Sequence, residues 1–354
     1  MGMTIDTDVV PVDAVFASPE RLRESFESRL VRLVDEELLG VFILVLANAC
    51  FQQTGFDRLS RPLATAFARW GARLDAADPR VTQAPADDLT VFRKLWEMGF
   101  EQLAATRWRR AGPWELQFNP LRALRPPRMS HVAVGALYRE FDPDGFHFNR
   151  PFLRKEVFWE GELGEAPVRL FFNKFPFAEL HGLLVPHPQA CKPQYLTAGD
   201  HDLVWRLAGR LGSGLPGLGF GYNAQGGYSS VNHLHFQMFV RSRGLYPIEA
   251  PHWRHNGGDR AYPLPVQRHD AGAPAWLAVQ QLHAAGSAYN LLYRPGVLYI
   301  VERAMQGSYP HSAWTNGFAW SELAGSVTTS DRDAFERLSK HELELEFGRL
   351  AIRS

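Results

Sequence analysis

The sequence predicts an α+β protein with a helical N-terminal region followed by a β-rich remainder. Apolar residues recur at helical spacing from residue 18 to about residue 107, after a Ser18-Pro19 start signal. From Trp114 onward, short strand-like segments dominate and helices are interspersed among them. Within this part, residues 233–238 alternate polar and apolar at the period of a β-strand.

Composition excludes several classes of partner. Lys plus Arg equals Asp plus Glu at 38 each, so no global field attracts nucleic acid or an acidic membrane. The longest apolar run, Leu39 to Cys50, is too short to span a bilayer. The two cysteines, Cys50 and Cys191, are far apart and in no metal spacing, which favours a reducing compartment such as the cytoplasm. The first residues lack the basic and apolar regions of a signal peptide.

Residues 1–85 are expected to form a helical appendage that packs on the main body, residues 86–354. Helices are expected at 18–36, 41–52, 61–75 and 87–107. Pro79 and Pro85 indicate a linker, and Asp87 or Asp88 is a plausible cap for the fourth helix. We assign no chemistry to the appendage.

The β-rich part is expected to alternate strands with a few helices. Residues 155–240 follow a strand–strand–helix–strand pattern, in which Asp200 is expected to cap a helix ending near residue 211. The other expected strands are 114–120, 289–293 and 297–301, and the other helices are 274–286 and 331–350.

A row of polar side chains is the strongest functional signal. At strand period His233, His235 and Gln237 share one face, and the apolar residues between them face the other way. Imidazole can be a neutral nucleophile near pH 7, whereas a carboxamide donates to an anionic oxygen and cannot act as an acid or base. There are two alternative interpretations. The histidines could be structural, with their ring nitrogens hydrogen-bonded within the fold, or they could be metal ligands.

A glycine-rich loop directly precedes this row. Glycines allow backbone N–H groups to approach an anion closely, so residues 219–230 are a candidate phosphate loop. The substrate-binding residues predicted in and beside it are Asn223, Gly226, Gly227, Ser229, Ser230 and Asn232.

The loop and the His-x-His-x-Gln segment together resemble the histidine-triad superfamily. The similarity is greatest to the branch with glutamine as its third member, which holds galactose-1-phosphate uridylyltransferase, diadenosine tetraphosphate phosphorylases and GDP-hexose phosphorylases. The string GYNAQGGYSSVNHLHFQ is most similar to the last group. The resemblance implies a histidine-triad-like antiparallel sheet with flanking helices in two pseudo-repeated halves. The active half would cover about 114–243 and a degenerate half about 244–354.

Two further segments fit this resemblance. Gln117, Asn119, Arg122 and Arg125 match a Gln-x-Asn-x-x-Arg-x-Leu-Lys segment of the GDP-hexose phosphorylases. With Arg128, the two arginines form a basic, proline-broken loop that could face a polyphosphate, although a solvated surface turn is the alternative.

The second segment supplies three more candidates. The family's Asn…His-x-Leu-x-x-Pro strand, which packs beside the histidine strand, corresponds to Asn173, Lys174 and His181. These residues are therefore predicted to bind substrate.

The resemblance implies a nucleotidyltransferase of the phosphorylase type acting on a nucleoside diphosphate sugar or a related dinucleotide. His235 would attack the α-phosphorus, Gln237 would hydrogen-bond a phosphate oxygen, and His233 would orient the loop or the nucleophile. Phosphate or a sugar phosphate would then accept the nucleotidyl group. The scheme requires no cofactor and no protein-bound metal, although a divalent ion could assist, and a homo-oligomer is compatible with it.

Three alternatives stay open at this point. A diadenosine polyphosphate phosphorylase would use the same residues on a longer phosphate chain. A nucleotide hydrolase is disfavoured because an amide cannot activate water. A non-catalytic nucleotide-binding protein would leave the histidine row inert.

The glutamine generates a prediction. Gln237→His adds an ionisable group beside the nucleotidyl intermediate and should raise hydrolysis relative to phosphorolysis. Product analysis in the presence of phosphate measures the partition, and an unchanged ratio would refute this role for Gln237.

Overall fold

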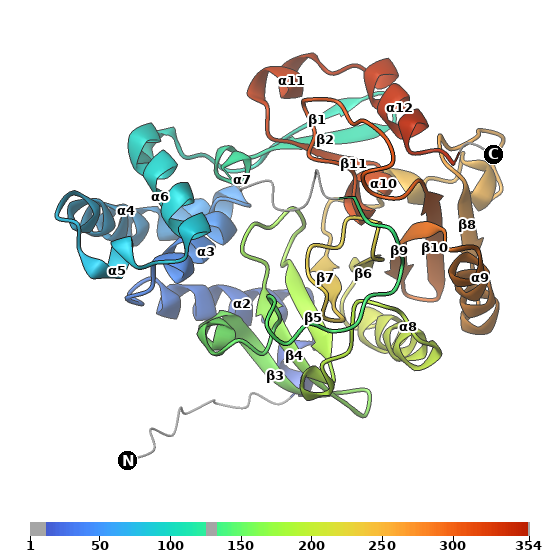
Figure 1. Ribbon diagram of the computed structural model, residues 1–354, viewed down its shortest axis with the longest axis horizontal. Helices are drawn as coiled ribbons and strands as arrows, with labels where there is room; N and C mark the ends of the chain where they lie inside the picture. Colours follow the sequence, from blue (N-terminus) through green and yellow to red (C-terminus); the bar gives the residue numbers. More distant parts are fainter. Residues whose placement is uncertain (1–11, 125–132, 353–354) are drawn as a thin grey trace.

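The computed structural model describes residues 12–124 and 133–352. A helical region packs beside an eight-stranded sheet, and a smaller three-stranded sheet lies across one end of the molecule (Figure 1). No helix in these residues is long and apolar enough to cross a membrane.

The helical region is built around one helix that is buried on nearly every side. The helices are α1 (Val12–Val15), α2 (Pro19–Leu33), α3 (Leu39–Ala49), α4 (Gln53–Asp75), α5 (Pro79–Thr82) and α6 (Ala86–Met98). Helix α3 contacts α2, α4 and α6, and its Phe42 packs against Trp70 and Phe92. Ser18 caps α2 as predicted.

The structure differs from the expectations at both ends of α6 and in the segment before it. Helix α6 stops at Met98 because Gly99 takes a left-handed φ of 84°, and a strand follows from residue 107. Pro85 occupies its N-cap position, which places the proposed caps Asp87 and Asp88 inside the first turn. The predicted linker also holds α5, which Asp78 caps.

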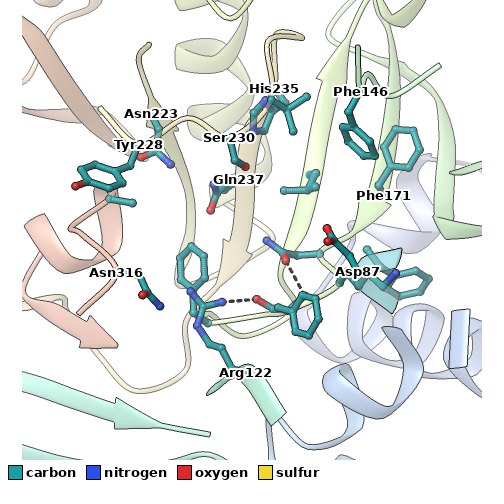
Figure 2. Close-up of a pocket in the computed structure, with 18 of the residues that line it drawn as sticks. Asp87, Arg122, Phe146, Phe171, Asn223, Tyr228, Ser230, His235, Gln237 and Asn316 are labelled. Atoms are coloured by element: carbon teal, nitrogen blue, oxygen red, sulfur yellow. Dashed lines mark hydrogen bonds between the residues drawn. The ribbon is translucent and has the colours of Figure 1, made fainter. Parts of the chain in front are cut away.

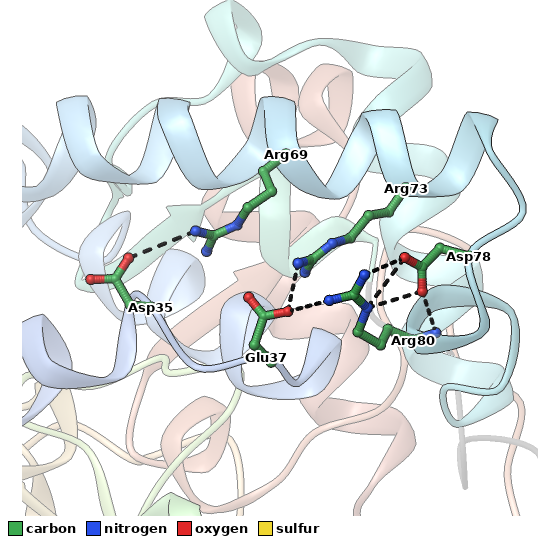
Figure 3. Close-up of polar contacts among 6 residues, drawn as sticks. All are labelled: Asp35, Glu37, Arg69, Arg73, Asp78 and Arg80. Atoms are coloured by element: carbon green, nitrogen blue, oxygen red, sulfur yellow. Dashed lines mark hydrogen bonds and ion pairs between the residues drawn. The ribbon is translucent and has the colours of Figure 1, made fainter.

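An ion-pair network ties the start of α3 to α4 and α5 (Figure 3). Glu37 contacts Arg73 at 2.5 Å and Arg80 at 2.9 Å, and Arg80 also contacts Asp78 at 2.6 Å. Glu37 and Arg80 are about half exposed, so solvent screens these pairs and their contribution to the stability of the fold is small.

The large sheet is antiparallel throughout, in the order β3-β4-β5-β7-β6-β9-β10-β8. Its strands are β3 (Val157–Leu163), β4 (Ala166–Phe172), β5 (Gly182–Pro186), β6 (Leu218–Asn223), β7 (Phe236–Val240), β8 (Val266–His269), β9 (Ala288–Arg294) and β10 (Val297–Arg303). An α+β fold with an antiparallel sheet and an N-terminal helical region is thus confirmed.

Two helices, α8 (Ala198–Gly212) and α9 (Gly272–Ala285), pack on each other and on this sheet. Each is followed by two antiparallel strands, which is the order expected of two related halves, although the repeat itself stays a prediction. Thr197 rather than Asp200 caps α8, and Asp200 instead accepts hydrogen bonds from Thr197 and Lys192.

The small sheet brings the two ends of the β-rich part together. Strand β2 (Trp114–Phe118) pairs antiparallel with β1 (Arg107–Ala111) and parallel with β11 (Ser326–Thr329). The short helices α7 (Pro120–Ala123) and α10 (Trp320–Leu323) lie next to these strands in the chain. The predicted last helix is two helices, α11 (Arg332–Arg337) and α12 (Lys340–Arg349), because Ser339 starts a new capping box with Glu342.

Candidate active site

The histidine segment departs from the predicted strand. Strand β7 begins at Phe236, so His233 and His235 precede it. The side chain of Gln194 takes the place of a neighbouring strand at this point, because its Oε1 accepts from the His235 N–H at 2.9 Å and its Nε2 donates to the His235 carbonyl at 3.2 Å. The Asn232 side chain in turn accepts from the backbone N–H of Gln194. The backbone of His235 is therefore held by buried amides.

The imidazole of His235 has one defined neutral tautomer. Its Nδ1 lies 2.8 Å from the His233 carbonyl, which can only accept, so Nδ1 carries the proton and Nε2 keeps its lone pair. Burial lowers the pKa of His235 to about 4, although the hydrogen bond to His233 acts in the opposite direction. A neutral imidazole with a free Nε2 lone pair is the form required of a nucleophile.

The Gln237 amide also has a defined orientation. Its Oε1 lies 2.9 Å from the indole Nε1 of Trp320 and 3.2 Å from Nε2 of His181. His181 accepts the Phe177 N–H on Nδ1, so its Nε2 bears the proton, and burial lowers its pKa to about 3. The Gln237 oxygen thus accepts two hydrogen bonds.

His235 and Gln237 line a cavity of about 560 Å³, within the usual range of about 300–1,000 Å³ for small-molecule sites. Figure 2 shows Asn223, Tyr228 and Asn316 on one side and Phe146, Phe171 and Asp87 on the other, with His235 and Gln237 between them. The aromatic end is lined by Phe146, Phe148, Phe152, Leu153, Phe171 and Phe172, and the polar end by Asn223, Tyr228, Thr315, Asn316, Thr328, Thr329 and Ser330.

Five predicted substrate-binding residues line this cavity: Arg122, Asn173, Lys174, Asn223 and Ser230. Arg122 donates to the Phe175 carbonyl at 2.6 Å, and its guanidinium lies 4.7 Å from the centre of the Phe177 ring. The Lys174 ammonium pairs with the buried Asp88 carboxylate at 2.6 Å, so part of its charge is already neutralised.

The other described candidates do not line the cavity. Gln117 donates to the Phe177 carbonyl, and Asn119 caps α7 and donates to the Cys50 carbonyl. The side chain of Ser229 is bonded to the Val231 carbonyl, and Asn232 donates to the carbonyls of residues 139 and 140. Arg125 and Arg128 lie outside the described residues.

The predicted glycines serve packing. Gly226 has φ of 77°, and a Cβ there would lie 1.9 Å from Sδ of Met305. A Cβ at Gly227 would lie 2.6 Å from the Tyr289 carbonyl, and its N–H already binds the Ala224 carbonyl. The Gly227 amide is therefore already bonded within the loop, and an anion contact of the Gly226 amide stays a prediction.

His233 acts through its backbone and its ring packing. Its carbonyl fixes His235, while its Nδ1 accepts the Phe148 N–H at 3.1 Å. Burial is the main cause that lowers its pKa to about 4. The imidazole of His233 therefore holds Phe148 in the cavity wall.

Comparison with known proteins identifies the segment that carries the site. Residues 114–239 match a family model described as "GDPGP1-like, N-terminal domain". GDP-D-glucose phosphorylase 1 of Danio rerio is 36% identical over 136 residues, 38% of each chain. GDP-L-galactose phosphorylase 1 of Arabidopsis thaliana is 28% identical over 149 residues, 38% of this chain and 33% of the relative.

Residues 114–239 are thus similar to the N-terminal domain of the GDPGP1-like family. The resemblance predicted from the sequence is thus confirmed. The matched part of this chain spans about 38% of the length of the Danio rerio protein and 33% of the Homo sapiens one, which is 34% identical over 134 residues.

The fold extends beyond this GDPGP1-like segment. The crystal structure of yeast Ap4A phosphorylase Apa2 superposes with a TM-score of 0.50 at 17% identity, covering 69% of this chain and 86% of that one. This similarity concerns the fold alone.

Several cavity residues were missed by the sequence reasoning because they come from outside the GDPGP1-like segment. Helix α6 supplies Asp87 and Asp88, and the segments after β10 and β11 supply Asn316 and Ser330. Only tertiary packing brings these stretches to His235. Among the described residues, no group of three or more His, Cys, Asp and Glu side chains is arranged to hold a metal ion.

The position of Arg122 makes its role testable. If its guanidinium contacts a substrate phosphate, Arg122→Gln should lower kcat/KM about ten- to a hundred-fold, the equivalent of about 1.5–3 kcal/mol for a charged hydrogen bond. Arg110→Gln, on the exposed side of β1, is the matched control. Equal steady-state kinetics for both variants would remove Arg122 from the site.

The low pKa of His235 predicts that the rate of nucleotidyl transfer hardly changes over the mildly acidic pH range. Because the pKa is about 4, the imidazole stays neutral from pH 8 down to about pH 5, and protonation should slow nucleotidyl transfer only as pH approaches 4. Single-turnover labelling with a nucleotide sugar, without phosphate, measures this step. A labelling rate that falls around pH 6.5, the pKa of a solvated histidine, would contradict the assignment of His235 as a buried neutral nucleophile.

Proposed function

We propose that this protein is a GDP-hexose phosphorylase, which converts a GDP-hexose and inorganic phosphate into GDP and a hexose 1-phosphate. The observation that carries the proposal is the neutral His235, with its Nε2 lone pair available, beside Gln237 in a cavity of nucleotide size. The similarity of this chain to GDP-D-glucose phosphorylase 1 and GDP-L-galactose phosphorylase 1 supports the same substrate class.

The proposed chemistry is a double displacement. His235 Nε2 attacks the α-phosphorus, a P–N bond forms, and the P–O bond to the β-phosphate breaks, releasing hexose 1-phosphate. An oxygen of inorganic phosphate then attacks the same phosphorus, which breaks the P–N bond and releases GDP. Each displacement is easier than one direct transfer through a more crowded arrangement.

The Gln237 amide explains why phosphate, rather than water, would receive the guanylyl group. Its Nε2 can donate to a non-bridging phosphoryl oxygen in both steps, which stabilises developing charge. An amide cannot take a proton from water, whereas a phosphate nucleophile is already an anion. The site therefore favours phosphorolysis over hydrolysis.

The aromatic end of the cavity suits a purine base. Phe146 and Phe152 remain 43% and 53% exposed although their rings line a cavity, so a stacked base would cover apolar surface that the fold leaves open. Asp87 lies on the same side of the cavity as Phe146 and Phe171 (Figure 2), and Glu156 also lines the cavity. Guanine presents an N1–H and a 2-amino group that a carboxylate can accept, and adenine lacks the N1–H donor.

The polar end suits a hexose. Hydroxyl and amide side chains such as Tyr228, Asn316 and Thr329 both donate and accept, which matches the hydroxyl groups of a sugar. The fold similarity to the yeast Ap4A phosphorylase supports no choice between a hexose and a second nucleoside.

The activity is tested with a panel of nucleoside diphosphate sugars and inorganic phosphate. We expect phosphate-dependent release of GDP and hexose 1-phosphate from GDP-hexoses, with ADP- and UDP-hexoses turned over far more slowly. No phosphate-dependent release from any member of the panel would refute the proposal.

The base assignment has its own test within the same panel. Asp87→Asn should reduce the preference for GDP-hexose over IDP-hexose, which lacks only the 2-amino group, by about ten-fold, the equivalent of about 1.4 kcal/mol for one lost hydrogen bond. Asp57→Asn on the exposed side of α4 is the control. An unchanged ratio in Asp87→Asn would assign the 2-amino group to another residue.

A further inference from the structure

We propose that Trp320 is a positioning residue, which holds the Gln237 amide so that its NH₂ group faces the reacting phosphoryl group. The inference rests on the proposed nucleotidyl transfer at His235. Trp320 itself does not line the cavity, and it reaches the reaction only through Gln237.

The hydrogen-bond partners of Gln237 determine which end of its amide faces the cavity. An indole N–H can only donate, so the atom 2.9 Å from Nε1 of Trp320 must be the amide oxygen. The protonated Nε2 of His181 donates to the same oxygen. No hydrogen bond joins Nε2 of Gln237 to another described residue, so this donor is available to a ligand.

Trp320 is itself held at its backbone and at its ring. Its backbone N–H donates to Oδ1 of Asn223 at 3.0 Å, and its indole stacks on Phe239 with centroids 5.0 Å apart and planes 10° apart. A Cβ at Gly221 would lie 2.3 Å from the indole, so only glycine leaves room for it there. Gly221 is directly opposite Gln237 in the β6–β7 pair, which brings the indole over that residue.

The contacts of Trp320 and His181 fix the orientation of the Gln237 amide, which a glutamine that donates to a phosphate requires. A free amide can rotate by 180° and present its oxygen to the phosphate, where it would repel the negative charge. Two donors on Oε1 disfavour that rotamer, since rotation would leave both donors facing the NH₂ group. The tryptophan thus makes Gln237 a donor throughout both displacements.

The test is a double-mutant cycle with Trp320→Phe and Gln237→Ala, read as kcat for phosphorolysis and as the calorimetric affinity for GDP. Trp320→Phe keeps an aromatic ring and removes the N–H. It should lower kcat about five- to twenty-fold and weaken GDP binding in the wild-type background, with little added effect when Gln237 is already alanine. Gly221→Ala, which displaces the indole, should reproduce the same pattern.

Trp114→Phe is the control for losing a buried indole. Trp114 is fully buried, lies away from the cavity, and its Nε1 has no hydrogen-bond partner among the described residues. Thermal melts of all variants report folding. If Trp320→Phe lowers kcat and GDP affinity equally with and without Gln237, the inference is overturned, because a packing role does not depend on that amide. No loss in the wild-type background would overturn it too.

The two proposals fail separately. If the wild type binds GDP but shows no phosphorolysis, the proposed function is refuted. The double-mutant cycle measured as GDP affinity still decides the role of Trp320. If the wild type neither binds GDP nor turns over a GDP-hexose, both are overturned.

Discussion

The site depends on the hydrogen bond from Nδ1 of His235 to the carbonyl of His233. A histidine nucleophile needs one nitrogen protonated and fixed so that the other keeps its lone pair, and a backbone carbonyl two residues away meets this need without adding charge. The carbonyl is in place because Gln194 pins the backbone of His235 on both sides. Burial then keeps the ring neutral, since no carboxylate contributes to its pKa.

The cavity around this nucleophile is assembled from segments far apart in the chain. Parallel pairing of β11 with β2 brings Thr328 and Thr329 to one end, while the start of α6 closes the other. The ion pair between Lys174 and Asp88 joins that helix to the loop after β4, and a Cβ at Gly40 would lie 2.4 Å from the same carboxylate. Helix α6, which begins the predicted main body, is therefore part of the cavity wall, and the division of the chain at residue 85 stays a prediction.

The sequence predicted the local features well, because they follow from short-range rules. Ser18 before Pro19 marked a true helix start, and the strands expected at 289–293 and 297–301 pair as the β9–β10 hairpin. The family resemblance identified the GDPGP1-like segment for a similar reason, since its most specific signal is a contiguous string.

The features of the site that were not predicted from the sequence depend on tertiary contacts. Gln194 replaces a strand partner for His235, and no local pattern predicts that a side chain will do so. No local pattern shows either that Gly226 and Gly227 make room for Met305 and the Tyr289 backbone, while the predicted anion contact of the glycine-rich loop stays untested. Trp320 and Asn316 reach the site only because the second half of the chain folds back against the first.

The central claim is that His235 forms a covalent bond to the α-phosphorus of the substrate. The most direct measurement is peptide mass spectrometry of the protein after incubation with a GDP-hexose in the absence of phosphate, with digestion at alkaline pH to preserve a phosphoramidate. The account predicts a guanylyl group on His235 that disappears when phosphate is added, as GDP forms, and that is absent from His235→Ala. An adduct on another residue, or turnover of a GDP-hexose by folded His235→Ala at the wild-type rate, would contradict it.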